Sequence, residues 1–130
     1  MAVLIDTSVL VNAERRGLSL ERAIGEEDRA ISAITVSELL HGVHRATDLG
    51  IRARREAFVE HLLASIEALA VTTTVARVHA HVWAGLEEKG TLIGAHDLWI
   101  GATALAHGMS VATANPGEFE RVPGLVVAPV

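Results

Sequence analysis

The sequence of 130 residues lacks cysteine, has a single lysine and contains no long apolar run. The absence of cysteine excludes disulfides and thiolate metal sites, and it suits a reducing cytoplasm, where we expect the protein to act. No stretch approaches the roughly 20 uninterrupted apolar residues of a membrane span. The first apolar run stops at Asp6 and has no basic residues before it, which is not the pattern of a signal peptide. We therefore expect a cytoplasmic globular protein without a membrane partner.

Several catalytic motifs of α/β proteins are missing as well. There is no GxxxxGK[ST] phosphate loop, no GxGxxG after a strand and no HExxH. A haloacid-dehalogenase-type phosphatase needs a second Asp two residues after the first, and that position is Ser8. A response-regulator receiver needs a lysine beyond a late strand, whereas Lys89 ends a predicted helix. The class that remains is a metal-dependent hydrolase with carboxylates and hydroxyls but no covalent nucleophile.

The composition is that of a globular chain. Half of the residues are apolar, and the length fits one domain with a substantial core, so we expect residues 1–130 to form a single domain. The formal net charge of −5 argues against a protein that coats nucleic acid non-specifically. Trp83 and Trp99 are expected to anchor the core.

Apolar residues alternate between the periods of strands and helices. Val36, Leu39, Leu40 and Val43, for example, share one face of a helix. The pattern predicts strands at residues 3–5, 29–35, 69–73, 109–113 and 124–129, and helices at residues 8–15, 18–26, 36–45, 51–65, 75–89 and 96–107. Strands that alternate with helices indicate an α/β fold with a mainly parallel sheet covered on both faces.

Acidic and amide side chains lie at predicted junctions between strands and helices. Asp6 follows the first strand, Glu38 lies in the helix after the second, and Asn115 and Glu118 follow the fourth. Asp97 opens the Ala-rich helix. Because open α/β sheets bind ligands beyond the carboxyl ends of their strands, we expect these residues to gather at one edge.

Each of these residues also has a structural explanation. Acids favour the first turn of a helix, and Thr35 with Glu38 forms a formal capping box. Asn115 fits the Asn-Pro-Gly turn that it begins. Together, however, crowded carboxylates raise one another's pKa values, and a hard divalent cation offsets that repulsion. Carboxylate oxygens suit Mg²⁺ or Mn²⁺.

Four strings in the chain, "IDTSVL", "ISAITVSELLHGV", "IGAHDLWIGATALAHG" and "VATANPGEFERVPGL", resemble PIN-domain ribonucleases of the VapC toxin type. The resemblance covers nearly the whole chain. It implies a three-layer α/β/α PIN-like domain over residues 1–130 with a central sheet of four to five strands. The family's catalytic and metal-binding acids carry over as Asp6, Glu38 and Asp97, with the hydroxyls of Thr7 and Ser8 beside them.

One family position departs from the usual pattern. The fourth acidic position of the family is often Asp, and here it is Asn115. Glu118 is therefore a second candidate for that metal-binding role. Arginines in or next to the first, third and fourth predicted helices are candidates for contacts to the RNA backbone, with a solvated surface as the alternative: Arg15, Arg16, Arg45, Arg52 and Arg55.

The resemblance further implies an endoribonuclease that uses one or two Mg²⁺ or Mn²⁺ ions and leaves 5′-phosphate and 3′-hydroxyl ends. It implies a homodimer and a cognate VapB-like antitoxin that carries a DNA-binding domain. Two alternatives stay open at this stage. One is a catalytically weak PIN-like module whose main task is partner binding, and the other is a structure-specific DNA nuclease on the same fold.

Overall fold

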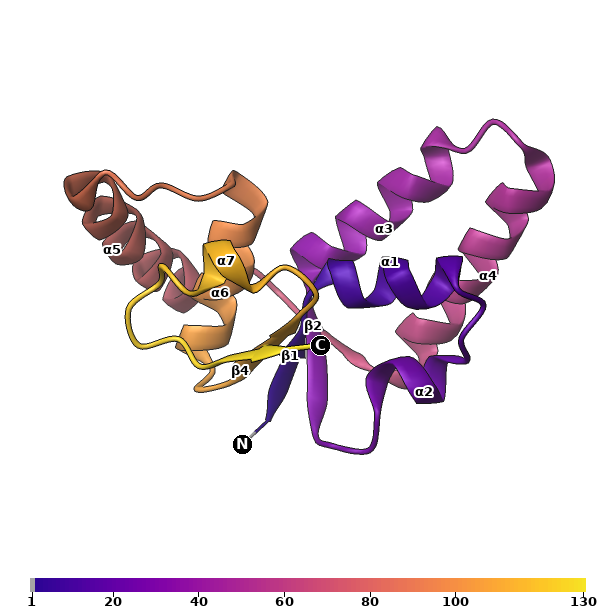
Figure 1. Ribbon diagram of the computed structural model, residues 1–130, viewed down its shortest axis with the longest axis horizontal. Coiled ribbons are helices and arrows are strands. Elements are labelled where there is room, and N and C mark those ends of the chain that lie inside the picture. Colours follow the sequence, from indigo (N-terminus) through magenta and orange to yellow (C-terminus); the bar gives the residue numbers. More distant parts are fainter. Residues whose placement is uncertain (1) are drawn as a thin grey trace.

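A computed structural model describes residues 2–130 and contains a five-stranded parallel sheet in the order β3-β2-β1-β4-β5 (Figure 1). The strands are β1 (Val3–Ile5), β2 (Arg29–Ser32), β3 (Glu67–Leu69), β4 (Ser110–Thr113) and β5 (Val127–Pro129). All four pairings are parallel, and Leu4 at the centre of β1 is aligned with Ala30 of β2 and with Val111 of β4. The carboxyl ends of all the strands therefore meet at one edge.

Helices cover both faces of this sheet. They are α1 (Thr7–Arg15), α2 (Leu20–Ile24), α3 (Ala33–Arg45), α4 (Leu49–Ser65), α5 (Thr73–Lys89), α6 (Ala95–Ala106) and α7 (Pro116–Phe119). Successive side chains of β1 point to opposite faces of the sheet. Ile5 therefore packs into a cluster with α1 to α4, whereas Leu4 packs against α6 and α7. The structure therefore confirms the predicted α/β fold with a parallel sheet, and the fold has three layers.

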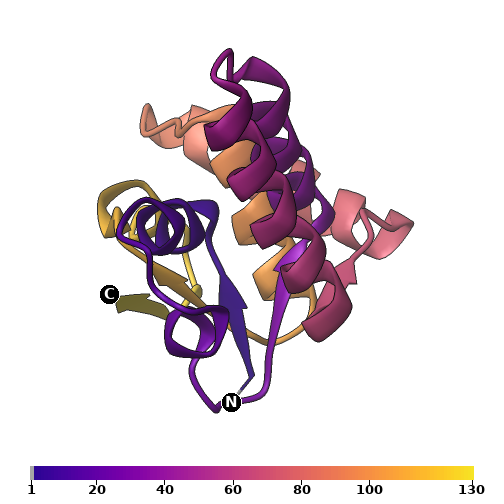
Figure 2. The same cartoon turned by 90° about the vertical axis from the view of Figure 1, so that its right-hand side faces the viewer.

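The helices diverge above the carboxyl edge of the sheet. Figure 1 shows the α3–α4 pair on one side and the α5–α6 pair on the other, and Figure 2 shows α3 and α4 lying side by side. A third cluster, centred on Val82, Leu86 and Leu98, joins α5 to α6. No helix of the described chain, residues 2–130, combines the length and the apolarity that a membrane crossing requires.

The helix expected over residues 18–26 is shorter, Leu20–Ile24, and the strand expected over residues 124–129 is Val127–Pro129. Two further predicted boundaries are wrong because a hydroxyl caps a helix. The second strand was expected to reach residue 35, but it ends at Ser32, whose side chain accepts a hydrogen bond from the backbone N–H of Ile34 (3.0 Å). Helix α3 therefore begins at Ala33, and the capping box of Thr35 and Glu38 is not formed. The third strand is Glu67–Leu69 and not 69–73, since Thr72 already caps α5.

Two further differences concern α7 and Trp83. Residues 116–119, expected as part of a turn, form the short helix α7 with Pro116 at its first position. Trp83 is 47% exposed and is therefore not a core anchor. Trp99 is half-buried and stacks on the ring of His79 with 3.4 Å between the ring centroids.

Candidate functional site

A hollow of about 320 Å³ lies at the carboxyl edge of the sheet. The parallel register brings the strand-end residues together there, and Asp97 joins them from the first turn of α6. The lining residues are Asp6, Thr7, Ser8, Val11, Asn12, Arg15, Glu38, Asp97 and Asn115. The structure thus brings together the predicted acids, both predicted hydroxyl residues and Asn115, whereas Glu118 lies outside this lining.

Asp6 is held at the bottom of the hollow by hydroxyl groups. The side chain is only 4% exposed, and its Oδ2 accepts hydrogen bonds from Ser8 Oγ (2.7 Å) and Thr113 Oγ1 (2.8 Å). Ser8 Oγ in turn accepts from the backbone N–H of Ala114 (3.0 Å). These bonds offset part of the cost of burying a carboxylate and fix its orientation at the junction of β1 and α1.

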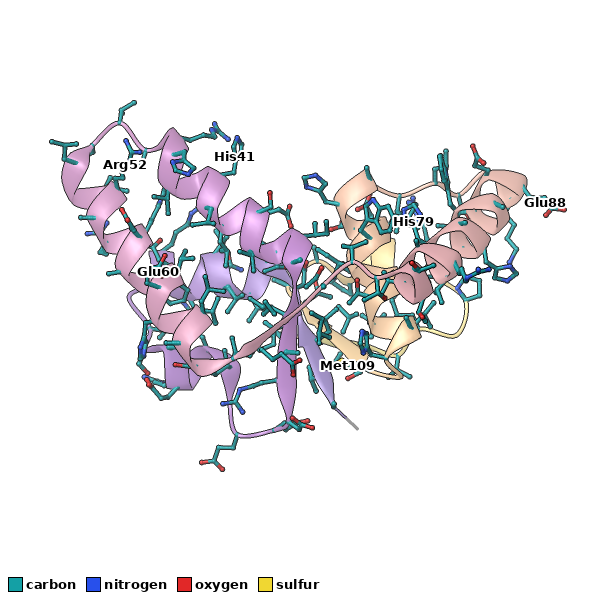
Figure 3. All side chains as sticks on the ribbon, turned by 180° about the vertical axis from the view of Figure 1, so that it is seen from behind. His41, Arg52, Glu60, His79, Glu88 and Met109 are labelled. Carbon is teal, nitrogen blue, oxygen red and sulfur yellow. The ribbon has the colours of Figure 1, made fainter. Side chains whose placement is uncertain are left out.

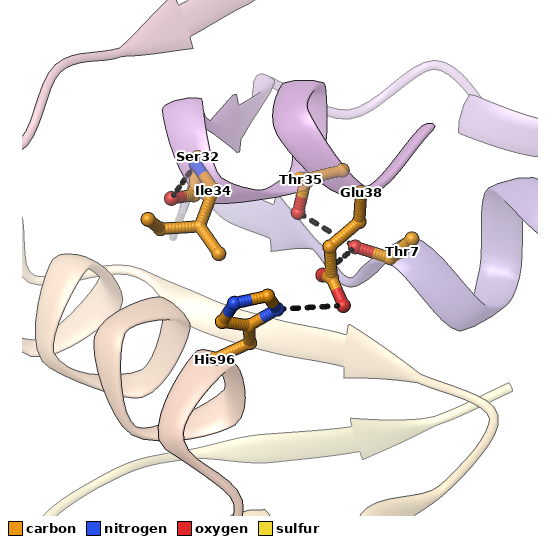
Figure 4. Close-up of polar contacts among 6 residues, drawn as sticks. All are labelled: Thr7, Ser32, Ile34, Thr35, Glu38 and His96. Carbon is orange, nitrogen blue, oxygen red and sulfur yellow. Dashed lines mark hydrogen bonds and ion pairs between the residues drawn. The ribbon is translucent and has the colours of Figure 1, made fainter. Parts of the chain in front are cut away.

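Glu38 is held by residues from two other helices (Figure 4). It lies in the second turn of α3, and Thr7 Oγ1 at the start of α1 is 2.7 Å from Glu38 Oε1 and 2.9 Å from Thr35 Oγ1. Because a hydroxyl has one proton and a carboxylate only accepts, Thr7 donates to Glu38. From α6, His96 Nδ1 lies 3.4 Å from Glu38 Oε2. Glu38 therefore links α1, α3 and α6 across the hollow.

Asp97 is the acid of the site whose pKa is raised. Burial, a hydrogen bond with Glu118 and the charges of Asp6, Glu118 and Glu38 together raise the pKa of Asp97 to about 8. The same hydrogen bond and the backbone N–H of Gly94 lower the pKa of Glu118. In the metal-free protein at neutral pH, the proton shared by this pair therefore resides on Asp97.

The donor set matches a hard divalent cation in its chemistry, because every acidic ligand and the Asn115 amide offer oxygen. Burial first, and the neighbouring charges after it, raise the pKa of Asp97, and a bound cation would offset both effects because it stabilises the charged carboxylate. Within residues 2–130, no three His, Asp or Glu side chains already converge on one ion position.

The raised pKa of Asp97 makes the stability of the metal-free protein depend on pH. The unfolded chain has the ordinary value near 3.8 and the folded chain about 8, so Asp97 favours folding at low pH and loses that contribution as pH rises. With chelator present, we expect the Tm of wild type to fall relative to Asp97→Asn between about pH 5 and pH 8. Thermal melts of both proteins across this range test it, and parallel curves would show that Asp97 has an ordinary pKa.

The arginines proposed to contact RNA occupy different places. Arg15 lines the hollow near the acids, whereas Arg55 donates to the backbone carbonyl of Gly42 (3.0 Å) and ties α4 to α3. Figure 3 shows Arg52 near the outer end of the α3–α4 pair, on the same part of the molecule as His41. The exposed side chains among the five are Arg15, Arg16 and Arg45.

Sequence reasoning missed two residues that support the site. Thr113 bonds Asp6, and Thr35 bonds Thr7, and both are fully buried. For Thr113 a signal was present, since it is a hydroxyl residue at the last position of a strand that ends at the ligand-binding edge. His96 of α6 also lies beside the site, since its ring contacts Glu38.

Comparison with known proteins places this geometry in context. A sequence profile described as "PIN domain" matches residues 3–125. Ribonuclease VapC1 of Rickettsia felis is 33% identical over 130 residues, which is all of this chain and 97% of that protein. The tRNA(fMet)-specific endonuclease VapC of Salmonella typhimurium is 36% identical over 95 residues, or 73% of this chain and 70% of that protein. The crystal structure of VapBC2 from Rickettsia felis, bound to a DNA fragment from its promoter, matches with a TM-score of 0.88 at 25% identity, covering 100% of this chain and 99% of that one.

Proposed function

Because this chain belongs to the VapC ribonucleases of the PIN-domain family, we propose that it is the endoribonuclease toxin of a toxin–antitoxin pair and hydrolyses phosphodiester bonds in RNA. The observation that carries the proposal is the acidic hollow. Three carboxylates from three segments of the chain face one space, and burial of Asp97, with its Glu118 hydrogen bond and the nearby charges of Asp6 and Glu38, raises the pKa of Asp97. Such crowding is costly for a purely structural cluster and useful for holding a cation.

The residues of the hollow have separable tasks in this reaction. Asp6, Glu38 and Asp97 would hold the metal, and Asn115 would add a neutral oxygen at the rim. When bound, one or two Mg²⁺ or Mn²⁺ ions would polarise the scissile phosphate and activate the attacking water, which leaves 5′-phosphate and 3′-hydroxyl ends. Thr7 and Ser8 keep the carboxylates of Glu38 and Asp6 in place through their 2.7 Å hydrogen bonds.

Arg15 supplies positive charge next to this acidic hollow. Its exposed side chain lines the space that holds Asp6 and Glu38. We propose that it binds an RNA phosphate beside the cleavage point and so helps a chain of net charge −5 to hold a polyanion. The remaining arginines, Arg16, Arg45, Arg52 and Arg55, are proposed to contact the RNA backbone farther from the acids.

The partner of this protein is a cognate VapB-type antitoxin, as in the VapBC complexes that share its fold. We propose that it enters an apolar groove of about 90 Å³ between α1, α3 and α4, adjacent to the acids. The apolar wall consists of Val11, Leu39, Phe58 and Val59. Charged side chains of both signs lie at its margin: Glu14, Glu38, Arg15 and Arg55. This surface fits an antitoxin segment with an apolar anchor and an arginine that reaches the acids.

Other properties follow as proposals from the family. We propose that residues 1–130 form one PIN domain, which the profile match over residues 3–125 supports. We also propose that the protein acts in the cytoplasm and forms a homodimer. Sedimentation or light scattering of the purified protein tests the dimer.

Asn115 is expected to influence the Mg²⁺ concentration that the protein needs for cleavage. Its side chain caps no backbone N–H of α7, although it precedes that helix, and it lines the acidic hollow. A neutral amide oxygen binds a hard cation more weakly than a carboxylate. Asn115→Asp should therefore lower the Mg²⁺ concentration for half-maximal cleavage by roughly several-fold, and Asn115→Ala should raise it. Cleavage rates over a Mg²⁺ series measure both, and an unchanged midpoint would limit Asn115 to its place before α7.

Digestion of RNA by the purified protein tests the proposed function. Total tRNA is a suitable first substrate, because one relative is named a tRNA(fMet)-specific endonuclease. The protein should cut RNA with Mg²⁺ or Mn²⁺, and EDTA should abolish cutting. Preference for a matched DNA would favour a DNA nuclease, and the absence of any cutting alongside tight antitoxin binding would favour a partner-binding module.

A further inference from the structure

The segment that leads into α6 is held from outside by α7 and the turn after it. Glu118 Oε1 accepts a hydrogen bond from the backbone N–H of Gly94 (3.1 Å), and Arg121 donates to the backbone carbonyl of Leu92 (3.0 Å). Gly94 is the N-cap of α6 and has no side chain with which to cap the helix. Two side chains from the C-terminal part of the chain thus bind the backbone of residues 92–94.

This segment determines where Asp97 lies. Asp97 is the third residue of α6, so its position relative to Asp6 and Glu38 depends on where the first turn begins. The connection from α5 spans only residues 90–94, and Gly90 and Gly94 both lie in it. Segments with few buried contacts and exposed backbone open more easily than the packed core.

We propose that Glu118 is a positioning residue of the active site, which holds the start of α6 through the Gly94 N–H and thereby places Asp97 opposite Asp6 and Glu38. This inference rests on the proposed function, and it assigns Glu118 a role other than metal ligand. The lining of the acidic hollow agrees, because it includes Asn115 and Asp97 but not Glu118. Glu118 is half-buried and directed at the backbone of Gly94.

Two substitutions at Glu118 separate positioning from metal binding. Glu118→Gln keeps an oxygen that accepts the Gly94 N–H but removes the charge, whereas Glu118→Ala removes the acceptor. Glu118→Ala should speed amide hydrogen exchange at residues 94–98 by roughly tenfold or more, the effect of losing a hydrogen bond to a charged group. Glu118→Gln should retain most of the protection and should bind Mn²⁺ within about threefold of wild type, since the amide preserves the contact.

Gly94 provides the reciprocal test. Its φ of −57° suits proline, so Gly94→Pro removes the N–H donor without requiring a new φ at that residue. Gly94→Ala is the matched control, because it keeps the N–H and its Cβ would meet Glu118 Oε2 at an ordinary 3.5 Å. Gly94→Pro should reproduce the faster exchange of Glu118→Ala at residues 95–98. Both variants should lower RNA cleavage, because Asp97 is displaced, and the double variant should be no worse than either single one. We call the two contacts from Glu118 and Arg121 to the backbone of residues 92–94 the clamp. If Glu118→Ala does not fold, Arg121→Ala tests the clamp with a smaller change.

The outcomes separate this inference from the proposed function. Exchange is measured without RNA or metal, so it tests the clamp even if wild type were to leave RNA intact, which would overturn the proposed function instead. Unchanged exchange at residues 94–98 in Glu118→Ala would overturn the clamp. An equal loss of Mn²⁺ affinity in Glu118→Gln and Glu118→Ala, with exchange unaltered in Glu118→Gln, would identify Glu118 as a metal ligand and overturn the inference.

Discussion

Replacement of Asp6 by Asn, Glu38 by Gln or Asp97 by Asn is expected to lower RNA cleavage more than about a hundredfold, because ligand replacements cost at least as much as changes in the residues around a metal. All three carboxylates line the same hollow, and each amide keeps the shape of the side chain while it removes the charge. Single-turnover cleavage at saturating Mn²⁺ measures the loss. Glu60→Gln, on the exposed outer side of α4 (Figure 3), is the matched control and should cleave like wild type.

Stability distinguishes a functional cluster from a structural one. Asp97→Asn should not destabilise the metal-free protein at neutral pH and is expected to stabilise it, because it removes a carboxyl whose charged form is disfavoured by burial and by the neighbouring acids. Asp6→Ala differs, since it leaves the hydroxyls of Ser8 and Thr113 without their acceptor in a buried place. Asn is therefore the better probe at position 6. A large loss of Tm in all three amide variants would show that the acids maintain the fold and do not form a metal site.

The second large effect concerns the antitoxin. Gly42 lines the apolar groove on α3, and a Cβ added to it would meet nothing within 4 Å. Gly42→Phe should fill the groove and weaken antitoxin binding by about tenfold or more, or roughly 1.4 kcal/mol. Gly42→Ala is the control, since a methyl group leaves the groove open and favours the helix. Antitoxin titration by calorimetry, with RNA cleavage as the second readout, measures both variants.

Metal should compete with the same partner. If an antitoxin arginine reaches Glu38 and its neighbours, higher Mn²⁺ concentrations should weaken the complex, and the antitoxin should weaken Mn²⁺ binding by the same factor. Wild-type affinity in Gly42→Phe would exclude the groove as the docking site. Antitoxin binding that leaves Mn²⁺ affinity unchanged would exclude direct contact with the acids and leave coverage of the RNA path as the mode of inhibition.

The fold was predictable because its signals are periodic. Strand and helix periods, and acids placed after strands, predicted a parallel α/β sheet and the edge at which Asp6, Glu38 and Asn115 meet. The end of β2 was predicted wrongly because two residues could serve as the N-cap of α3. Ser32 and Thr35 both suit an N-cap, and the sequence does not indicate that β2 ends early enough for Ser32 to serve.

The contacts between distant segments could not be predicted in the same way. Thr113 lies 107 positions from Asp6, and His96 lies 58 positions from Glu38, so no local pattern pairs them. The exposure of Trp83 likewise depends on which face of α5 packs against α6. Tertiary packing decides these features, and the sequence alone leaves them open.

We propose above all that this acidic hollow hydrolyses RNA with a divalent metal. The most direct test of this proposal is mass spectrometry of the ends that the purified protein produces from tRNA with Mn²⁺, with the Asp97→Asn variant and an EDTA reaction in parallel. We expect new 5′-phosphate and 3′-hydroxyl ends with wild type and metal, and none in the two parallel reactions. Cleavage that persists in EDTA, or that leaves 2′,3′-cyclic phosphate ends, would contradict metal-dependent hydrolysis at this site.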